Sequence, residues 1–185
     1  TGNSGFIMHQ PYLNSNVNVV RFSGGSTTSF LYSVDTVNMN AFACVLNLID
    51  NGYSGTDILF GPDYYELFRH PRIFPPLPSD TMLGLHSKPF IYYINGQSQL
   101  NWNITATKQN PNYVILYFKF TGNNTKNDIP IIINSNLSGF TGSLGDFVCF
   151  NSSHTDEDRI QVEGYLAHKY NLQTFLPSSH LYSTE

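Results

Sequence analysis

Charged side chains are scarce in this sequence of 185 residues. Asp, Glu, Lys and Arg make up 12% of it, about half their share in an average soluble domain. The nine Lys and Arg residues are outnumbered by thirteen Asp and Glu residues, and the formal net charge is −4 at pH 7. No basic run occurs. Because binding to a phosphate backbone needs clustered Lys and Arg, this composition argues against a nucleic-acid partner.

Long apolar stretches are also missing. No run approaches the 18 residues that a membrane-spanning helix requires, so we expect no membrane insertion. Hydrophobic residues nevertheless make up 41% of the chain and aromatic residues 15%, which is enough for a substantial core. A chain of this length fits one domain, since β-sandwiches often run to about 200–250 residues. We therefore expect a single domain over residues 1–185.

Only two cysteines are present, Cys44 and Cys149. Each lies inside an apolar run, which favours two buried free thiols. A disulfide between neighbouring strands remains open, because its geometry cannot be read from a sequence. The two residues show no CxxC spacing and no nearby paired histidine, which argues against a zinc site.

Known catalytic patterns are absent as well. A glycosidase needs two positioned carboxylates, but the chain has four glutamates and no strand carries a pair at two-residue spacing. Glu66 stands alone, with Asp63 three residues before it. No Gly-x-Ser-x-Gly elbow occurs, and the six histidines show no metal-ligand spacing. We therefore expect no enzymatic activity.

Short strand signals separated by turns run through most of the chain. The Asn95-Gly96 pair is the strongest two-residue hairpin signal, and it predicts that Tyr93 pairs with Ser98 and Ile91 with Leu100. Residues 1–18 read as polar and loop-like, and residues 70–80 as a proline-rich surface loop. About ten to twelve strands are expected, which predicts an antiparallel sandwich. The main predicted strands cover residues 17–22, 27–32, 40–49, 57–61, 64–69, 81–85, 90–94, 113–120 and 129–134, with a further core strand ending at residue 150.

One helix is predicted at about residues 155–170. Thr155 is a natural N-cap, and Asp158 stands where a capping-box acid would reach back. Asn171 is placed to end the helix in a left-handed conformation. Gly164 lowers helix stability by roughly 1 kcal/mol relative to Ala, so we expect another segment to approach the backbone there. The predicted apolar stripe contains Ile160, Gly164 and Ala167, with Val162, Tyr165, Leu166 and Lys169 beside it.

Three runs near the C-terminus carry a resemblance to a known family. They are Gly-Asp-Phe-Val-Cys-Phe-Asn at 145–151, Asp-Glu-Asp-Arg-Ile-Gln-Val-Glu-Gly-Tyr-Leu-Ala-His-Lys-Tyr-Asn-Leu at 156–172, and Leu-Pro-Ser-Ser-His-Leu-Tyr at 176–182. This quarter of the chain resembles the C-terminal signature of concanavalin A-like (laminin-G-like) jelly-roll domains. Two departures are visible: Tyr170 stands where the family usually has Trp, and Leu181 where it usually has Pro.

The resemblance implies an all-β, antiparallel two-sheet jelly-roll sandwich with one short C-terminal helix. It also implies that residues 1–16 are an N-terminal extension and that residues 171–185 form a tail packing back on the body. Such domains occur in secreted bacterial proteins, in phage proteins and in large DNA viruses. The architecture hosts lectins, glycosidases and inert structural modules, so it indicates fold better than function.

Lectin-like sites of this fold stack sugar rings on aromatic faces and bind hydroxyls with Asn and Asp. The predicted ligand-binding residues are Trp102, Tyr92, Tyr93, Tyr64 and Asn101. The alternative for each aromatic ring is packing within the sheet. No cofactor is expected, with calcium as the exception to test, because related lectins bind it through clustered oxygens. Its best local cluster is Asp50, Asn51 and Asp57.

The sequence therefore predicts a non-enzymatic surface module. The expected role is a structural or attachment component of a virion or an extracellular assembly, with glycans or other structural subunits as partners and oligomer formation left open. A dedicated carbohydrate-binding, lectin-like module of a secreted protein is the alternative, and a glycoside hydrolase is a remote one. Four Asn-x-Ser/Thr sequons, at Asn103, Asn123, Asn136 and Asn151, agree with an exterior location.

Overall fold

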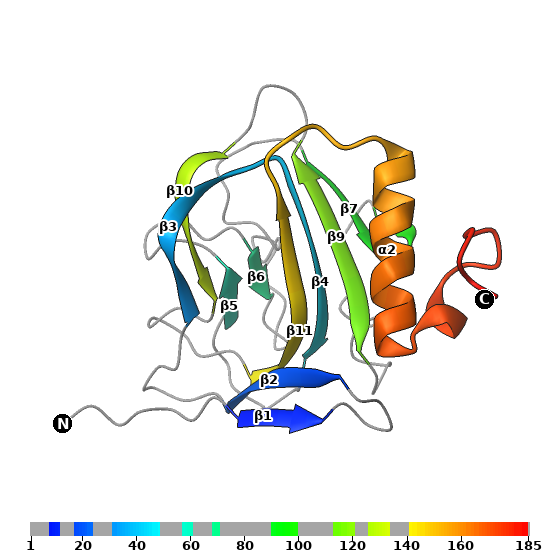
Figure 1. Ribbon diagram of the computed structural model, residues 1–185, viewed down its shortest axis with the longest axis horizontal. Coiled ribbons are helices and arrows are strands. Elements are labelled where there is room, and N and C mark those ends of the chain that lie inside the picture. The colour runs from blue at the N-terminus through cyan, green and yellow to red at the C-terminus, as the bar shows by residue number, and fades with distance from the viewer. Residues whose placement is uncertain are drawn as a thin grey trace, which may run out of the picture.

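The computed structural model describes residues 8–11, 17–23, 31–48, 57–60, 68–70, 90–99, 113–120, 126–133 and 141–184. These residues form eleven strands, one α-helix and one short 3-10 helix (Figure 1). The prediction of an antiparallel, all-β chain with a single C-terminal α-helix is confirmed for this part of the chain.

Seven strands form one antiparallel sheet, in the order β1-β2-β11-β4-β9-β7-β8. Several neighbours in this order come from distant parts of the sequence, and the sheet brings the late strand β11 beside the early strands β2 and β4. The C-terminal strand β11 lies between β2 and β4. The bounds are β1 Met8–Pro11, β2 Asn18–Ser23, β4 Ala41–Leu48, β7 Phe90–Ile94, β8 Gln97–Gln99, β9 Val114–Phe120 and β11 Thr141–Phe150.

Four further strands form a second antiparallel sheet, in the order β3-β10-β5-β6. Their bounds are β3 Leu31–Met39, β10 Lys126–Ile133, β5 Asp57–Phe60 and β6 Phe68–His70. In Figure 1 these strands lie on one side of β4 and β11, and the helix α2 (Asp156–Tyr170) lies on the other side. The larger sheet is therefore flanked by the helix on one face.

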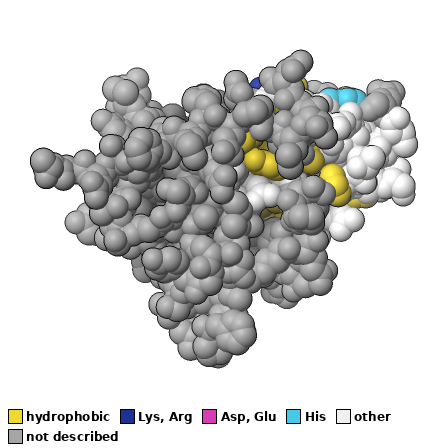
Figure 2. Space-filling view, turned by 90° about the horizontal axis from the view of Figure 1, so that it is seen from below, with side chains coloured by type: hydrophobic (Ala, Val, Ile, Leu, Met, Phe, Trp, Pro, Cys, Tyr) yellow, Lys and Arg dark blue, Asp and Glu magenta, His cyan; other side chains and the backbone are white. Residues whose placement is uncertain are grey.

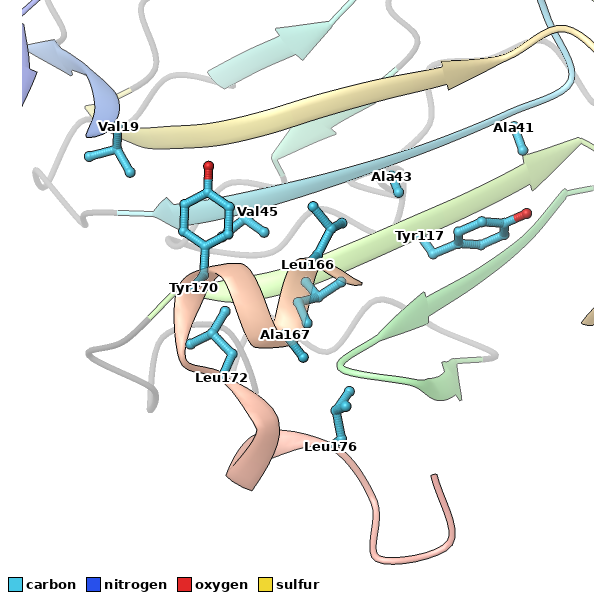
Figure 3. Packing of buried hydrophobic residues seen from close by; sticks show 11 residues of the cluster. Val19, Ala41, Ala43, Val45, Tyr117, Leu166, Ala167, Tyr170, Leu172 and Leu176 are labelled. Carbon is cyan, nitrogen blue, oxygen red and sulfur yellow. The ribbon is translucent and has the colours of Figure 1, made fainter. Parts of the chain in front are cut away.

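Strand β4 is buried on both faces, which explains its nearly continuous apolar sequence. Ala43 and Val45 pack with Leu166 of α2 in a hydrophobic cluster between helix and sheet (Figure 3). Phe42, which alternates with them, points the other way and stacks on Phe118 of β9 with ring centroids 5.1 Å apart. The small side chains on the helix side allow α2 to lie close to the strand.

The helix begins and ends where the sequence predicts. Thr155 Oγ1 accepts a hydrogen bond from the Asp158 backbone N–H at 3.1 Å, and Asp158 Oδ2 accepts one from the Thr155 N–H at 2.7 Å. This reciprocal pair is a complete capping box. Asn171 is left-handed, with φ 56°, and Leu172 N–H bonds back to the Ala167 carbonyl. That is a Schellman ending, with Asn171 in the position usually taken by glycine.

The predicted hairpin at Asn95-Gly96 is also confirmed. Both residues have positive φ, 48° and 76°, as a type I′ turn requires. Tyr93 pairs with Ser98 as expected, and Leu100 lies outside the described residues. Asn95 anchors the turn, because its Oδ1 accepts a hydrogen bond from the Ile115 N–H of β9 at 2.8 Å.

Two strand predictions were wrong in position. Residues 1–18 were expected to be loop-like, yet β1 pairs with β2. Pro11 is tolerated there because β1 is the edge strand of its sheet. Strand β3 continues to Met39, beyond the predicted end at residue 32; Val34, Thr36 and Val37 are the β-branched residues that favour this extension. The strand predicted at 81–85 lies outside the described residues.

Candidate functional site

Charged side chains are buried on the inner side of α2, which the apolar stripe did not predict. Glu163 is completely buried, and Arg159 is 9% exposed. They lie four residues apart, so they share one side of the helix. His180 of the C-terminal tail is also buried and completes the cluster. We call Arg159, Glu163 and His180 the ionic cluster.

One carboxylate oxygen joins the three members of the ionic cluster. Arg159 Nη1 donates a hydrogen bond to Glu163 Oε2 at 2.5 Å, and His180 Nε2 lies 3.2 Å from the same oxygen. On the other side of the imidazole, Nδ1 accepts a hydrogen bond from the Tyr182 backbone N–H at 3.3 Å. These contacts together require the neutral tautomer of His180 that carries its proton on Nε2.

The guanidinium of Arg159 is held by more than its carboxylate partner. It lies over the Tyr93 ring of β7, 3.9 Å from the ring centroid. Arg159 Nε also lies 3.6 Å from Asp156 Oδ1. Stacking on an aromatic face suits the weakly hydrated guanidinium group. Arg159 therefore connects the helix to β7, the strand next to the edge of the large sheet.

Burial changes the proton affinities of the cluster. It raises the pKa of Glu163 to about 7, although Arg159 acts in the opposite direction. It lowers the pKa of His180, and the nearby Arg159 charge lowers it further. Glu163 Oε1 has no hydrogen-bond partner among the described residues. An unsatisfied, buried carboxylate oxygen explains physically why the ionised form is disfavoured.

This cluster is better suited to holding the fold together than to catalysis. A general acid or base must lie within hydrogen-bond reach of the group it protonates. Glu163 and His180 are covered by the tail and the helix, and each is at most 8% exposed. Their contacts instead attach the tail to α2.

A second polar group connects α2 to strand β11. Tyr170 Oη accepts a hydrogen bond from the Asp146 N–H at 2.7 Å and donates one to Asp146 Oδ1 at 3.1 Å. Lys169 Nζ lies 2.6 Å from Asp146 Oδ2. The register of β11 with β4 shifts between Leu144 and Phe147, so Asp146 lies at an irregularity of the strand. At this irregularity the Tyr170 hydroxyl accepts the hydrogen bond of the Asp146 backbone N–H. A tryptophan at position 170 would lack that hydroxyl.

A third polar group fixes the loop between β11 and α2. Tyr117 Oη lies 3.1 Å from His154 Nδ1, and Lys119 Nζ donates to the His154 carbonyl. The His154 ring also packs on Phe150, with centroids 3.9 Å apart. Burial raises the pKa of Tyr117 and lowers the pKa of His154. The sequence offered no signal for this contact, since the partners lie 37 residues apart.

The predicted ligand-binding residues fall in different places. Tyr92 is 5% exposed and stacks on Phe118, with centroids 6.4 Å apart. Tyr93, the next residue of β7, contacts Arg159 on the helix side. Successive residues of a strand point to opposite faces, so these two rings do not share one stacking surface. Trp102, Tyr64 and Asn101 lie outside the described residues, and their role stays a prediction.

Two of the three predicted calcium ligands lie outside the part of the chain that the structure describes. Asp50 and Asn51 lie outside the described residues, and Asp57 is described only as the first residue of β5. Within the described ranges, no group of three or more His, Cys, Asp or Glu side chains could hold a metal ion.

Both cysteines are free thiols, as the sequence favoured. Cys44 is buried in β4 and Cys149 is half-buried in β11. The strand register places Cys44 opposite Phe147, and Cys149 opposite Phe42. The cysteines are therefore diagonal neighbours, at a Cα separation of about 7–8 Å that a disulfide does not bridge without backbone movement.

Figure 2 shows a group of hydrophobic side chains among the described residues on the face seen from below, next to side chains of other types and backbone. Tyr165 and Leu181 are large side chains that are more than half exposed. In the part of the chain described, no helix has the length and apolar character needed to cross a bilayer.

Compared with known proteins, the chain matches no protein-family model, no curated protein and no solved structure.

Proposed function

We propose that this chain is a non-enzymatic surface module, a structural or attachment component of a virion or an extracellular assembly. One observation carries the proposal: the three C-terminal runs that resemble concanavalin A-like domains contact one another as a framework. Tyr170 bonds to Asp146 of the first run, and His180 of the third bonds to Glu163 of the second. These contacts between the three runs support the proposal that the chain resembles concanavalin A-like domains in architecture.

The finer architecture is proposed on the same basis. In a two-sheet jelly roll, the large sheet would pack on the small sheet through Phe42, Cys44, Leu46 and their neighbours on β9. These side chains are almost fully buried on the face that points away from α2. Burial on that face supports a covering layer, and the β3-β10-β5-β6 sheet is the candidate for it.

The non-enzymatic role is supported by what the unusual titratable groups do. Groups with shifted pKa values often mark catalytic sites, but structural ion pairs shift pKa values as well. Glu163, His180, Tyr117 and Tyr170 each have a partner that connects two segments of the fold. Their positions are explained by the framework alone.

Glycan binding is the more specific form of the proposal. The low charge and the abundance of neutral polar residues suit a surface that binds sugar hydroxyls. Because Tyr92 and Tyr93 have packing partners, the platform would be built from Trp102 and Tyr64, with Asn101 as a hydrogen-bonding side chain. The dedicated lectin-like module of a secreted protein remains the alternative, and it would use the same residues.

A glycan-array screen of the purified chain, with calcium and with a chelator, tests this proposal. Specific binding that is lost in Trp102→Ala would support the glycan-binding form. The matched control is Tyr165→Ala, which removes an exposed aromatic ring from α2 that is not among the predicted ligand-binding residues. Calcium-dependent binding would bring Asp50, Asn51 and Asp57 into the site.

An array on which the folded protein binds no glycan would contradict glycan binding. The role as a structural component of an assembly would then be the form of the proposal that stands. Size-exclusion chromatography with light scattering would then measure self-association, as expected of an assembly subunit. Turnover of an oligosaccharide by the wild-type chain would overturn the non-enzymatic role.

A further inference from the structure

The loop between β11 and α2 contains one of the four Asn-x-Ser/Thr sequons, at Asn151-Ser152-Ser153. It joins the end of β11 to the start of α2. In Figure 1 this loop crosses over the end of the large sheet, at the top of the drawing. The other three sequons lie outside the described residues: Asn103, Asn123 and Asn136.

The loop exposes the whole sequon. Asn151, Ser152 and Ser153 are all exposed, and none of them belongs to a helix or a strand. An N-linked sugar chain is bulky and hydrophilic, so a folded protein holds one only on a side chain that faces solvent. The exposure of all three residues therefore leaves room for a glycan at Asn151 in the folded chain.

The side-chain amide of Asn151 has no structural task. Asparagine in a loop usually supports the backbone, through a hydrogen bond from its side chain to a nearby main-chain group. Among the described residues, the Asn151 side chain makes no such bond. Asn40 supports the loop instead: its Nδ2 donates to the Asn151 carbonyl at 2.6 Å, and its N–H donates to the Phe150 carbonyl at 2.7 Å. The backbone of Asn151 is therefore held while its amide stays accessible.

The hydroxyl two residues later is not used either. Thr155, not Ser153, is the N-cap of α2. Within the described part of the chain, the Ser153 side chain makes no hydrogen bond. The loop is fixed next to it through His154, whose ring contacts Tyr117 and whose carbonyl accepts a hydrogen bond from Lys119. Both groups that define the sequon, the amide and the hydroxyl, are therefore accessible.

We propose that Asn151 is a site of N-linked glycosylation. This inference rests on the exterior location in the proposed function, because the modifying enzyme, an oligosaccharyltransferase, acts in the secretory route. The chain is its acceptor substrate: Asn151 Nδ2 attacks C1 of an oligosaccharide that is linked to a lipid pyrophosphate. The C1–N bond forms as the C1–O bond breaks. The lipid pyrophosphate leaves with the bonding electrons, and the amide gives one proton to a base of the transferase.

A glycan at Asn151 also restricts how the module assembles. It would occupy the end of the large sheet beside the N-terminus of α2, so that end would face solvent and not another subunit. It would also add hydrophilic surface to a chain in which charged residues make up only 12%.

Secretion of the full chain from cultured animal cells, behind a cleavable signal peptide, tests the proposal. Peptide N-glycosidase in heavy-oxygen water converts each glycosylated asparagine into a labelled aspartate, which peptide mass spectrometry then locates. We expect the label at Asn151 in most of the folded, secreted chains. Because the label is read at each site separately, modification at another sequon does not affect the result.

Matched substitutions separate the sequon from the loop that carries it. Ser153→Ala removes the hydroxyl and should abolish the label at Asn151, whereas Ser153→Thr should keep it. Ser152→Ala removes the neighbouring hydroxyl but leaves the sequon intact, so it should be labelled as the wild type is. Both serines are exposed, and surface substitutions of this kind change stability little.

A folded, secreted wild-type chain without the label at Asn151 would overturn the glycosylation site. The proposed function would stand in that case, since the glycan array measures what the chain binds and not what it carries. A label that persists in Ser153→Ala, or one found only in aggregated material, would also overturn the site. Retention of the folded wild-type chain inside the cells would instead contradict the exterior location, on which both proposals depend.

Discussion

The ring of Tyr182 occupies the space that a side chain at Gly164 would fill. A Cβ on Gly164 would overlap the ring atoms Cγ and Cδ2 of Tyr182. Glycine at this position lowers the intrinsic stability of the helix, but it allows Tyr182 of the C-terminal tail to lie close to the helix backbone. The expected backbone approach at Gly164 is confirmed, and its partner comes from eighteen residues further along the chain.

Replacing Gly164 by Ala should destabilise the protein. Overpacking against Tyr182 is expected to cost about 1–3 kcal/mol, which outweighs the roughly 1 kcal/mol of helix propensity that Ala adds. Urea unfolding measures the difference. Gln161→Ala, at an exposed position of the same helix, is the matched control and should change the unfolding free energy by less than about 0.5 kcal/mol.

A double-mutant cycle shows whether the cost arises from this contact. In a Tyr182→Ala background the space beside residue 164 is vacant, so adding Gly164→Ala should be neutral or stabilising. An equal cost of Gly164→Ala in both backgrounds would rule out the Tyr182 contact as its cause.

Features that depend on a few neighbouring residues were predictable from the sequence. The capping box needs Thr155 and Asp158, and the I′ turn needs Asn95 and Gly96. In each case the signal lies within four residues. The double-sided burial of β4 could also be expected, because an apolar run of that length has no polar face to expose.

The ionic cluster was not predictable in the same way. An amphipathic pattern counts Arg159 and Glu163 as outward-facing residues, since charges are rarely buried without a partner. Their third partner, His180, lies seventeen residues beyond Glu163 in the sequence. It contacts Glu163 only because the C-terminal tail turns back along α2. Tyr93 was assigned to a sugar platform for a similar reason: its contact with Arg159 depends on how the helix is placed on the sheet. Such contacts become visible only with the tertiary structure.

Removing the Tyr170 hydroxyl should weaken the connection between α2 and β11. Tyr170→Phe leaves the Asp146 N–H without the partner that it has at 2.7 Å. The loss of a partly buried hydrogen bond of this kind costs about 1–3 kcal/mol. Thermal and urea unfolding measure this change. Tyr165→Phe removes the hydroxyl of a mostly exposed ring on the same helix, and equal effects of the two substitutions would contradict a specific role for Tyr170.

The N-cap of α2 should contribute measurably to stability. Thr155→Ala removes both the acceptor for the Asp158 N–H and the Thr155 Oγ1–Asp158 Oδ2 hydrogen bond of 2.8 Å. A loss of about 1 kcal/mol is expected for a cap of this type. Ser153→Ala, two residues earlier in the exposed loop, is the control for a general loss of a hydroxyl group. A Thr155→Ser variant should retain most of the stability, and a loss as large as that of Thr155→Ala would contradict the capping role.

The two thiols should be unreactive in the native protein. Cys44 is fully buried, and burial raises its pKa well above the usual value; burial raises the pKa of Cys149 to about 12. Because the thiolate is the reactive species, a thiol reagent at pH 8 should label neither residue in the folded chain within minutes and both in denaturant. Intact mass spectrometry before and after reduction should show no disulfide. Rapid labelling of Cys44 without denaturant would show that β4 is less well covered than its burial indicates.

Glu163 should make the protein less stable as the pH rises towards neutrality. Its pKa is raised from 4.5 to about 7 in the folded state, so the folded protein binds a proton that the unfolded chain has already lost. The resulting stabilisation is fully present below pH 4.5 and is lost as the pH rises to about 7. A shift of this size corresponds to a change on the order of 3 kcal/mol. In Glu163→Gln, whose side chain does not titrate, this part of the pH dependence should disappear.

Urea unfolding of both proteins at several pH values between 4.5 and 8 measures the effect as a difference. The free energy of unfolding of Glu163→Gln relative to the wild type should increase with pH, because only the wild type must ionise a buried carboxyl. The contribution of His180 is common to both proteins and cancels in the comparison to first order. Glu157→Gln, on the exposed first turn of α2, should leave the wild-type pH dependence unchanged. A constant difference between Glu163→Gln and the wild type across this range would mean that Arg159 keeps Glu163 ionised throughout, and that the carboxylate is a permanent member of an ion pair.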